Sequence, residues 1–273
     1  MRIKDMLISI WAIISGIIIF SIIIFLIGYI FFKGYKVINF EFLFDVPRGL
    51  RLGQEGGIAP AIVGSFISSG IATIISSLLG TITAIHLNFY EKSKKRKEII
   101  NFVIKTIGGI PSIVLGLFGY TVFTLYFGFG RSIISGSLTL AIMIFPAIEM
   151  RIDRAFKEFD KNLILASYSL GVSKSYTIWK IIIPMCKESI LSSFSLGYGY
   201  SIGATAPIMF CMAVVNSPIT LNITKPTMSL SYHLYILMTQ GISEEMAYGT
   251  AFVLLFIIIL IIIFSTFIGK NRR

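Results

Sequence analysis

Long apolar runs separated by short polar segments dominate the pattern of this chain. Six runs reach the length of about 20 residues that a helix needs to cross roughly 30 Å of hydrocarbon. They cover approximately residues 7–31, 61–89, 100–127, 132–150, 185–215 and 246–268. The pattern therefore predicts an all-α integral membrane protein with six transmembrane helices.

Two polar segments are expected to form loops on the outer side of the membrane. Residues 32–60 contain VPRGLRLGQEGGIAP, whose prolines, glycines and charges break both helical and strand patterns. Residues 216–245 contain a run predicted to form a short helix before Gly241. We expect residues 1–60 to form a first helix with its external loop, and residues 61–273 to form the core of the domain.

The segment of about 151–184 is too polar at first to span a membrane and too regular to be disordered. Leu163 to Leu170 is predicted to be a short amphipathic helix, which Gly171 ends in a left-handed conformation. Ser173 is predicted to cap the next helix, which rises toward Pro184 at the start of the next span. The result is either a projecting elbow suited to docking on a soluble protein or an ordinary folded loop.

Composition supports a membrane protein, since 55% of the 273 residues are hydrophobic, 14% are charged and the mean hydropathy is +0.86. The net charge is +11. Basic residues are retained on the cytoplasmic side, and their distribution predicts that both termini are cytoplasmic in a cell (plasma) membrane. The run Glu91–Glu98 either contacts anionic lipid or only fixes orientation. Because the charges are divided among separate loops, nucleic-acid binding is not expected.

Enzymatic chemistry is not indicated. Neither His86 nor His233 has an acid, base or metal constellation around it, and Cys186 and Cys211 show no metal spacing. No G-x-x-x-x-G-K-[ST] sequence is present, so the chain cannot hold ATP by the usual phosphate-binding loop. We expect no catalytic residue, no metal and no cofactor on this chain.

The stretch GYGYSIGATAPIMF, residues 197–210, carries much glycine, hydroxyl and proline for a membrane span. Hydroxyl groups and free backbone N–H groups at a bent helix are suited to an anion pathway. The same residues also permit close helix packing, with hydroxyls bonded to their own helix. Both interpretations stay open from these residues alone. A second possible kink lies in PSIVLGLFG, which begins at Pro111.

Several segments carry a family resemblance. Gly171, Ile181, Ile183 and Pro184 match the spacing of the G-x9-I-x-L-P half of the coupling loop of ABC-transporter permeases. GGIAPAIVGSF, GGIPSIVLGLFG and SIGATAPIMF, in that order over residues 56–268, resemble the phosphate ABC permease family PstA.

The resemblance implies the type I importer (MetI-like) permease fold. It also implies two cytoplasmic PstB-like ATPase subunits that hold ATP with Mg, a PstC-like permease or a second copy of this chain, and an external PstS-like phosphate-binding protein. The chain itself would be the phosphate permease subunit, and not an enzyme. The residues implied to couple it to the ATPase are Leu165, Ala166, Ser167, Leu170, Gly171, Ile181 and Pro184.

The resemblance also favours a pathway lining over plain packing. The implied lining residues are Tyr198, Tyr200, Ser201, Gly203, Thr205, Pro207, Pro111 and Ser112. Within residues 197–210 this sequence departs from the family pattern at two positions, because Tyr200 stands in place of arginine and Ala204 in place of glutamate. In the coupling loop, Leu165, Ala166 and Ser167 stand where the family has Glu-Ala-Ala. Two alternatives therefore remain: a permease for another oxyanion such as molybdate, tungstate or sulfate, and a membrane regulatory subunit without transport.

Overall fold

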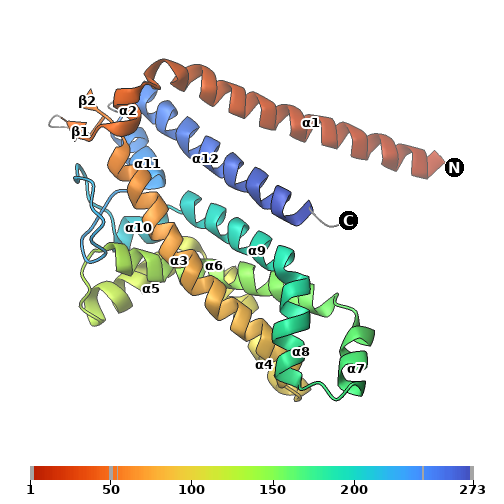
Figure 1. The fold of residues 1–273 in the computed structure, drawn as a ribbon. Coiled ribbons are helices and arrows are strands. Elements are labelled where there is room, and N and C mark those ends of the chain that lie inside the picture. The colour runs from red at the N-terminus through yellow and green to blue at the C-terminus, as the bar shows by residue number, and fades with distance from the viewer. Residues whose placement is uncertain (1–2, 49–51, 54, 242, 271–273) are drawn as a thin grey trace.

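The computed structural model describes residues 3–48, 52–53, 55–241 and 243–270. In this part of the chain it contains twelve α-helices and one pair of short strands (Figure 1). The long helices are α1 (Ile3–Gly34), α3 (Ala59–Ile85), α6 (Ile133–Lys157), α9 (Ile183–Gly203) and α12 (Glu244–Lys270). The shorter ones are α2 (Phe40–Phe44), α4 (Lys94–Gly109), α5 (Ser112–Gly119), α7 (Lys161–Ser169), α8 (Lys174–Thr177), α10 (Ala206–Cys211) and α11 (Leu230–Gln240).

Four helical segments are long and apolar enough to cross a membrane: Ile8–Val37, Ala59–Tyr90, Ile133–Lys157 and Glu244–Phe267. A fifth exists only if Lys94–Gly109 and Ser112–Tyr126 count as one span, and these two parts are bent by 98°. The predicted span 185–215 is split between α9 and α10 and does not meet the same criteria as one helix. The multi-pass helical architecture is confirmed. Six continuous spans are not found among the described residues, because glycine, proline and polar residues interrupt two of them.

α3 and α6 form the central pair of the bundle and run in the same direction. Gly80 of α3 lies against the backbone of Glu149, and farther along both helices the Asn88 side chain donates a hydrogen bond of 2.8 Å to Asp153 Oδ1. Small residues on α3 let the two backbones approach closely. The main hydrophobic core surrounds this pair, and α6 contributes the largest share of its buried residues.

The hairpin end of the bundle is the end that carries α2 and the strands β1 (Pro47–Arg48) and β2 (Glu55–Gly56), which pair antiparallel (Figure 1). The expectation that this segment has no strand was wrong, because Gly53, at φ +83°, lies in the turn between the strands, and Gly56 pairs with Pro47 where no side chain would fit. Phe42 and Ile58 pack there against Leu237 of α11 and Ala247 of α12, in a second hydrophobic cluster.

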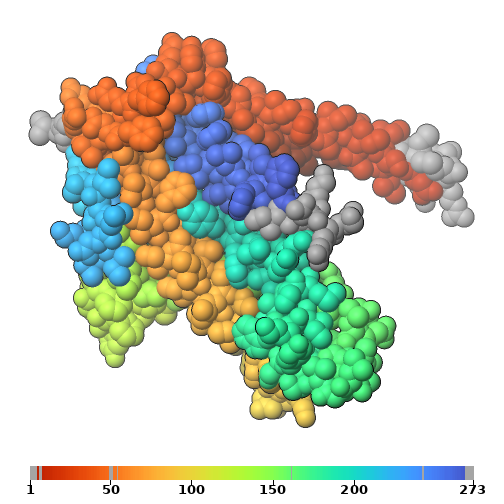
Figure 2. All heavy atoms as spheres, in the orientation of Figure 1, coloured from red at the N-terminus to blue at the C-terminus, as the bar shows by residue number. Residues whose placement is uncertain are grey.

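The opposite end carries the elbow, which we define as residues 161–177 with helices α7 and α8. It projects from the bundle beyond the ends of α3 and α6 (Figures 1 and 2). The predicted helix at 163–170, its end at Gly171 and the helix that Ser173 caps are all confirmed.

α1 lies beside α12, and Gly34 packs directly on the backbone of Tyr248 at the hairpin end (Figure 1). In its most apolar stretch the side chains of α1 are exposed within this chain. An apolar helix with so little burial is suited to contact with lipid or with another subunit.

Candidate functional site

The span that contains α9 and α10 is broken between them. Ala204 is extended, with φ −73° and ψ 130°, and it ends α9. α10 begins at Ala206, and Pro207 lies in its first turn, where the missing N–H of proline leaves no helical hydrogen bond unmade. The sequence therefore sets a break, rather than a gentle kink, within this span.

A second break separates α4 from α5. Pro111 disfavours the helical conformation for the residue before it, and Ile110 is accordingly extended, with φ −73° and ψ 130°. Ser112 then starts α5, and the π-helical segment Tyr120–Tyr126 continues it. The predicted kink at Pro111 is confirmed as the sharp bend of 98°.

The two breaks lie close together because α5 packs directly on α10. A Cβ atom at Gly116 would lie 2.8 Å from the Phe210 ring and 2.9 Å from the carbonyl oxygen of Ala206. The thiol of Cys211 also contacts the Gly116 carbonyl, with 3.5 Å between sulfur and oxygen. A side chain at 116 would not fit between the two short helices, so glycine at this position lets α5 and α10 pack side by side.

A cavity of about 630 Å³ lies at these breaks. α9 contributes one face of its helix, with positions 196, 199, 200 and 203 at the spacing of successive turns. The complete lining is Ser112, Met143, Ser195, Leu196, Gly199, Tyr200, Gly203, Ala204, Thr205, Ala206, Ile258 and Ile262. Its polar side chains are all neutral hydroxyls, so the cavity offers hydrogen bonds without a charged group.

The structure brings some of the predicted path residues together. Ser112, Tyr200, Gly203 and Thr205 line the cavity. Pro111 and Pro207 do not line it but shape the two helix breaks beside it.

Tyr198 and Ser201 lie elsewhere. The Tyr198 hydroxyl donates to the carbonyl oxygen of Phe66 at 3.3 Å and lies at a separate apolar groove between α3, α9 and α12. The Ser201 hydroxyl is buried and donates to the Tyr198 carbonyl oxygen at 2.8 Å. Both residues therefore serve helix packing in this structure.

Sequence reasoning missed Ser195 and Met143, which also line the cavity. Helical spacing could have identified Ser195, because it lies one turn before Gly199 on the same face. Helical geometry also explains why Tyr198 and Tyr200 lie at different sites, since residues two apart on a helix face nearly opposite directions. Met143 comes from another helix and carries no such signal.

The elbow is held in shape by polar contacts between its two helices. The hydroxyls of Ser167 and Thr177 are buried and lie 2.7 Å apart. Gly171 connects the helices at φ +75°, with open space where a Cβ atom would be. The Ser173 hydroxyl accepts a hydrogen bond from the Tyr176 N–H at 3.4 Å and caps α8.

The outer surface of the elbow is apolar. Leu165 is 62% exposed and Leu170 is 82% exposed, and Ala166 beside them is exposed as well. Ile181 is half-buried, and Pro184 is exposed in the first turn of α9. Exposed leucines at a projecting elbow form a surface suited to a partner protein.

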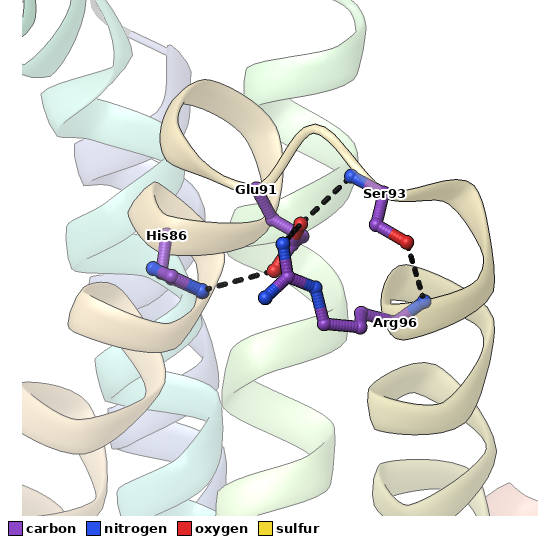
Figure 3. Close-up of polar contacts among 4 residues, drawn as sticks. All are labelled: His86, Glu91, Ser93 and Arg96. Atoms are coloured by element: carbon purple, nitrogen blue, oxygen red, sulfur yellow. Dashed lines mark hydrogen bonds and ion pairs between the residues drawn. The ribbon is translucent and has the colours of Figure 1, made fainter.

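Polar contacts around Glu91 hold the turn between α3 and α4 (Figure 3). The buried Glu91 carboxylate accepts a 2.7 Å hydrogen bond from the Ser93 N–H and pairs with Arg96 at 3.0 Å and with His86 at 3.8 Å. The Ser93 N–H, followed by the charge of Arg96, holds the pKa of Glu91 below its ordinary value of 4.5, although burial opposes the shift. Glu91 is therefore an anion at neutral pH and ties the basic run 92–97 to the bundle.

The described residues contain no group of three or more His, Cys, Asp or Glu side chains that could hold a metal. His233 is buried, and its Nδ1 atom lies 3.1 Å from the Thr250 hydroxyl.

Comparison with known proteins identifies the family. The model for "Binding-protein-dependent transport system inner membrane component" matches residues 76–271. The chain belongs to this family. Binding-protein-dependent inner membrane components are the permease subunits of ABC transporters, so the chain is a translocation subunit and not an enzyme.

Relatives support the same assignment. The chain is 27% identical to the probable ABC transporter permease protein YqgI of Bacillus subtilis, over 92% of this chain and 90% of that protein. It is 28% identical to the phosphate transport system permease protein PstA 2 of Mycobacterium bovis, over 80% of this chain and 72% of that protein.

The fold is similar to that in a crystal structure of a bacterial alginate ABC transporter in complex with a periplasmic protein bound to an alginate pentasaccharide. The TM-score is 0.67 at 14% identity, over 99% of this chain and 98% of that chain. At this identity the similarity supports the fold alone, and the predicted ABC-importer permease fold is confirmed.

Proposed function

We propose that this permease subunit carries phosphate, and that the cavity at the two helix breaks forms part of its path. The observation that carries the proposal is the convergence of Ser112, Tyr200 and Thr205 on one cavity beside two interrupted membrane helices. The printed name of the mycobacterial relative supports phosphate as the cargo.

The chemistry of the cavity is suited to an anion that enters and leaves. A bare charge in hydrocarbon is strongly unfavourable, so the path must supply hydrogen-bond donors. Hydroxyl groups supply these donors. Ser112, the first residue of α5, lines the cavity, so the N-terminus of α5 lies at the cavity wall. This end is the positive end of the dipole of α5 and its continuation to Tyr126. Neutral donors hold an anion less strongly than arginine would, which favours release.

The direction of transport requires energy. Moving a doubly negative ion toward a negative interior costs about 4–5 kcal/mol per 100 mV, at roughly 2.3 kcal/mol per charge. We propose that PstB-like ATPase subunits, which hold ATP with Mg, supply this energy through the elbow. The exposed Leu165 and Leu170 form the docking surface, and Gly171 sets the angle of that surface relative to α8.

The proposed orientation follows from charge. The elbow end carries the basic run Lys94–Lys97, together with Arg151, Arg154 and Lys174. Because basic residues remain on the inner side, we place the elbow and both termini in the cytoplasm. The hairpin end then faces outward, where a PstS-like phosphate-binding protein delivers its cargo. A PstC-like permease or a second copy of this chain completes the pair of permease subunits.

These parts form an alternating-access cycle. Closure of the ATPase subunits moves the elbow and opens the path to the outside, and ATP hydrolysis resets it. The path passes beside the bend between α4 and α5 and the bend between α9 and α10.

One observation favours a second candidate. Tyr200 and Ala204, which replace the arginine and glutamate of the family pattern, both line the cavity. A cavity without this charged pair fits a permease for another oxyanion such as molybdate, tungstate or sulfate. It also fits a membrane regulatory subunit that binds its partners without transport.

Uptake by the reconstituted complex separates these functions. Proteoliposomes with the permease pair, the ATPase subunits and the binding protein should accumulate labelled phosphate when ATP is supplied. Excess sulfate, molybdate or tungstate should leave this uptake unchanged. Competition by one of these ions would assign another oxyanion, and ATPase activity without any uptake would assign the regulatory role.

A further inference from the structure

One acidic side chain inside the bundle has no role in the proposed path. Glu149 lies on α6 within a membrane-spanning segment and is only 1% exposed. Both of its carboxyl oxygens lack a hydrogen-bonding partner among the described residues. A carboxylate buried without a partner is strongly destabilising, so the group needs a neutralising ligand.

The surroundings of Glu149 are hydroxyl-rich. A Cβ atom at Gly80 of α3 would lie 3.4 Å from the Glu149 nitrogen and 3.5 Å from its Cα atom. Side chains on a helix slant toward its N-terminus, and α3 runs in the same direction as α6. The carboxyl group is therefore directed at the turn of α3 that precedes Gly80, where Ser76 and Ser77 are buried with hydroxyls that also lack a partner.

Among the residues that the structure describes, no basic side chain forms an ion pair with Glu149. On its own helix, the charged groups that act on it are Asp153 and Lys157, and these two already pair with each other. At this level the facing turn of α3 presents the two serine hydroxyls.

The other helices packed on α6 do not supply a partner either. α4 packs on α6 where Gly108 meets Pro146. Lys105, one turn before Gly108 on α4, is exposed. Beside Glu149, α9 approaches through Gly197, where an added Cβ atom would lie 2.5 Å from the Ile148 side chain. Nearer the elbow it approaches through Cys186, whose thiol points to the Ala155 carbonyl oxygen, and there Lys187 is exposed and Glu188 is half-buried.

We propose that Glu149, with Ser76 and Ser77, forms a proton-binding site in the seam between α3 and α6. A proton taken from water at the elbow end binds one carboxyl oxygen, and the resulting O–H donates a hydrogen bond to a serine hydroxyl. Asp153 lies one turn closer to the elbow end and is partly accessible, so it marks the route of entry.

A proton fits the site better than a metal cation does. Hard cations in proteins take about six or more oxygen ligands. Glu149, Ser76 and Ser77 together offer four side-chain oxygens, whereas a proton needs only one acceptor. The site is also separate from the cavity at the helix breaks, whose lining does not include these residues.

Infrared difference spectroscopy on the complete complex in lipid nanodiscs tests the proposal. At neutral pH the spectrum of the wild type minus that of Glu149→Gln should contain the C=O stretch of a neutral carboxylic acid. The exposed Glu98 provides the matched control, because Glu98→Gln should remove only carboxylate bands. If Glu149→Gln does not fold, Ser76→Ala and Ser77→Ala, which keep Glu149, should shift the neutral-acid band to higher frequency through loss of its hydrogen bond.

Three outcomes would overturn the proposal. The first is that Glu149 gives carboxylate bands in place of the neutral-acid band, and the second is that these carboxylate bands shift when Na⁺ is exchanged for a larger cation. The third is a neutral-acid band that neither serine variant changes. The second of these outcomes would instead assign a cation site. None of these readouts depends on the transported anion, so a failure here is distinct from a failure of the proposed phosphate transport.

Discussion

Tyr200, in the last turn of α9, and Ala204, the extended residue that ends α9, both line the cavity at the helix breaks. They are the positions at which the family pattern has arginine and glutamate. An arginine at 200 and a glutamate at 204 would face one cavity, where opposite charges attract each other. The two charges missing from this cavity therefore form a pair and are not independent of each other.

This arrangement predicts how charges affect transport. Ala204→Glu alone places an unpaired negative charge in the anion path and should lower phosphate uptake at least tenfold, which corresponds to about 1.4 kcal/mol. The double variant Tyr200→Arg with Ala204→Glu should return uptake to near the level of the wild type, because the two charges compensate. Initial rates of ATP-dependent uptake measure both effects. A strong gain in the double variant would show that neutral donors alone do not sustain transport.

The elbow predicts a second effect, on partner binding. Gly171 has φ +75°, a conformation that costs a β-branched residue roughly 1–2 kcal/mol. Gly171→Val should change the angle between α7 and α8 and weaken co-purification of the ATPase subunit severalfold, without loss of membrane insertion.

Gly128 provides the matched control, since it has φ +71° and equally open space but lies far from the elbow. Gly128→Val should therefore leave ATPase co-purification unchanged. Equal loss in both variants would point to general destabilisation, and unchanged binding in Gly171→Val would refute the role of the elbow.

Much of this arrangement is visible in the sequence. Gly171, Ser173 and Pro184 placed the elbow correctly, because a left-handed glycine, a helix cap and a proline in the first turn act locally. Pro111 and Pro207 likewise indicated where membrane helices are interrupted.

What the sequence could not provide depends on tertiary contacts. The bend at Ile110 reaches 98° because α5 also packs against α10 through Gly116, which lies far from it in the chain. The assignment of Tyr198 to the path overlooked the helical period, which directs it toward Phe66. The partnerless carboxyl of Glu149 is likewise a property of three-dimensional packing, since an acidic residue near the end of a span usually reaches water.

The turn at Glu91 predicts a pH-dependent change. The pKa of Glu91 lies below its ordinary value of 4.5. The contribution of Glu91 to stability is therefore complete at pH values above this ordinary pKa and is lost as the pH falls through the lowered pKa of the folded protein. Glu91→Gln should expose the run Lys92–Lys97 to trypsin at neutral pH severalfold faster than in the wild type, because the ion pair with Arg96 is lost.

Glu98→Gln, at an exposed position on α4 directly after this turn, should leave the cleavage rate unchanged. Equal cleavage rates in the wild type and Glu91→Gln would show that the contacts of Glu91 do not hold this turn.

The central claim is that the cavity at the helix breaks is the path of the transported anion. Gly203 lines this cavity, with only Ile258 within 4 Å of an added Cβ atom, whereas Gly70 lines the apolar groove on the other side of α9 and has equally open space. The most direct measurement is ATP-dependent uptake of labelled phosphate by proteoliposomes that contain Gly203→Phe or Gly70→Phe. We expect Gly203→Phe to reduce uptake at least tenfold while the ATPase subunit remains bound, and Gly70→Phe to transport at nearly the rate of the wild type. Full uptake through Gly203→Phe would contradict the claim.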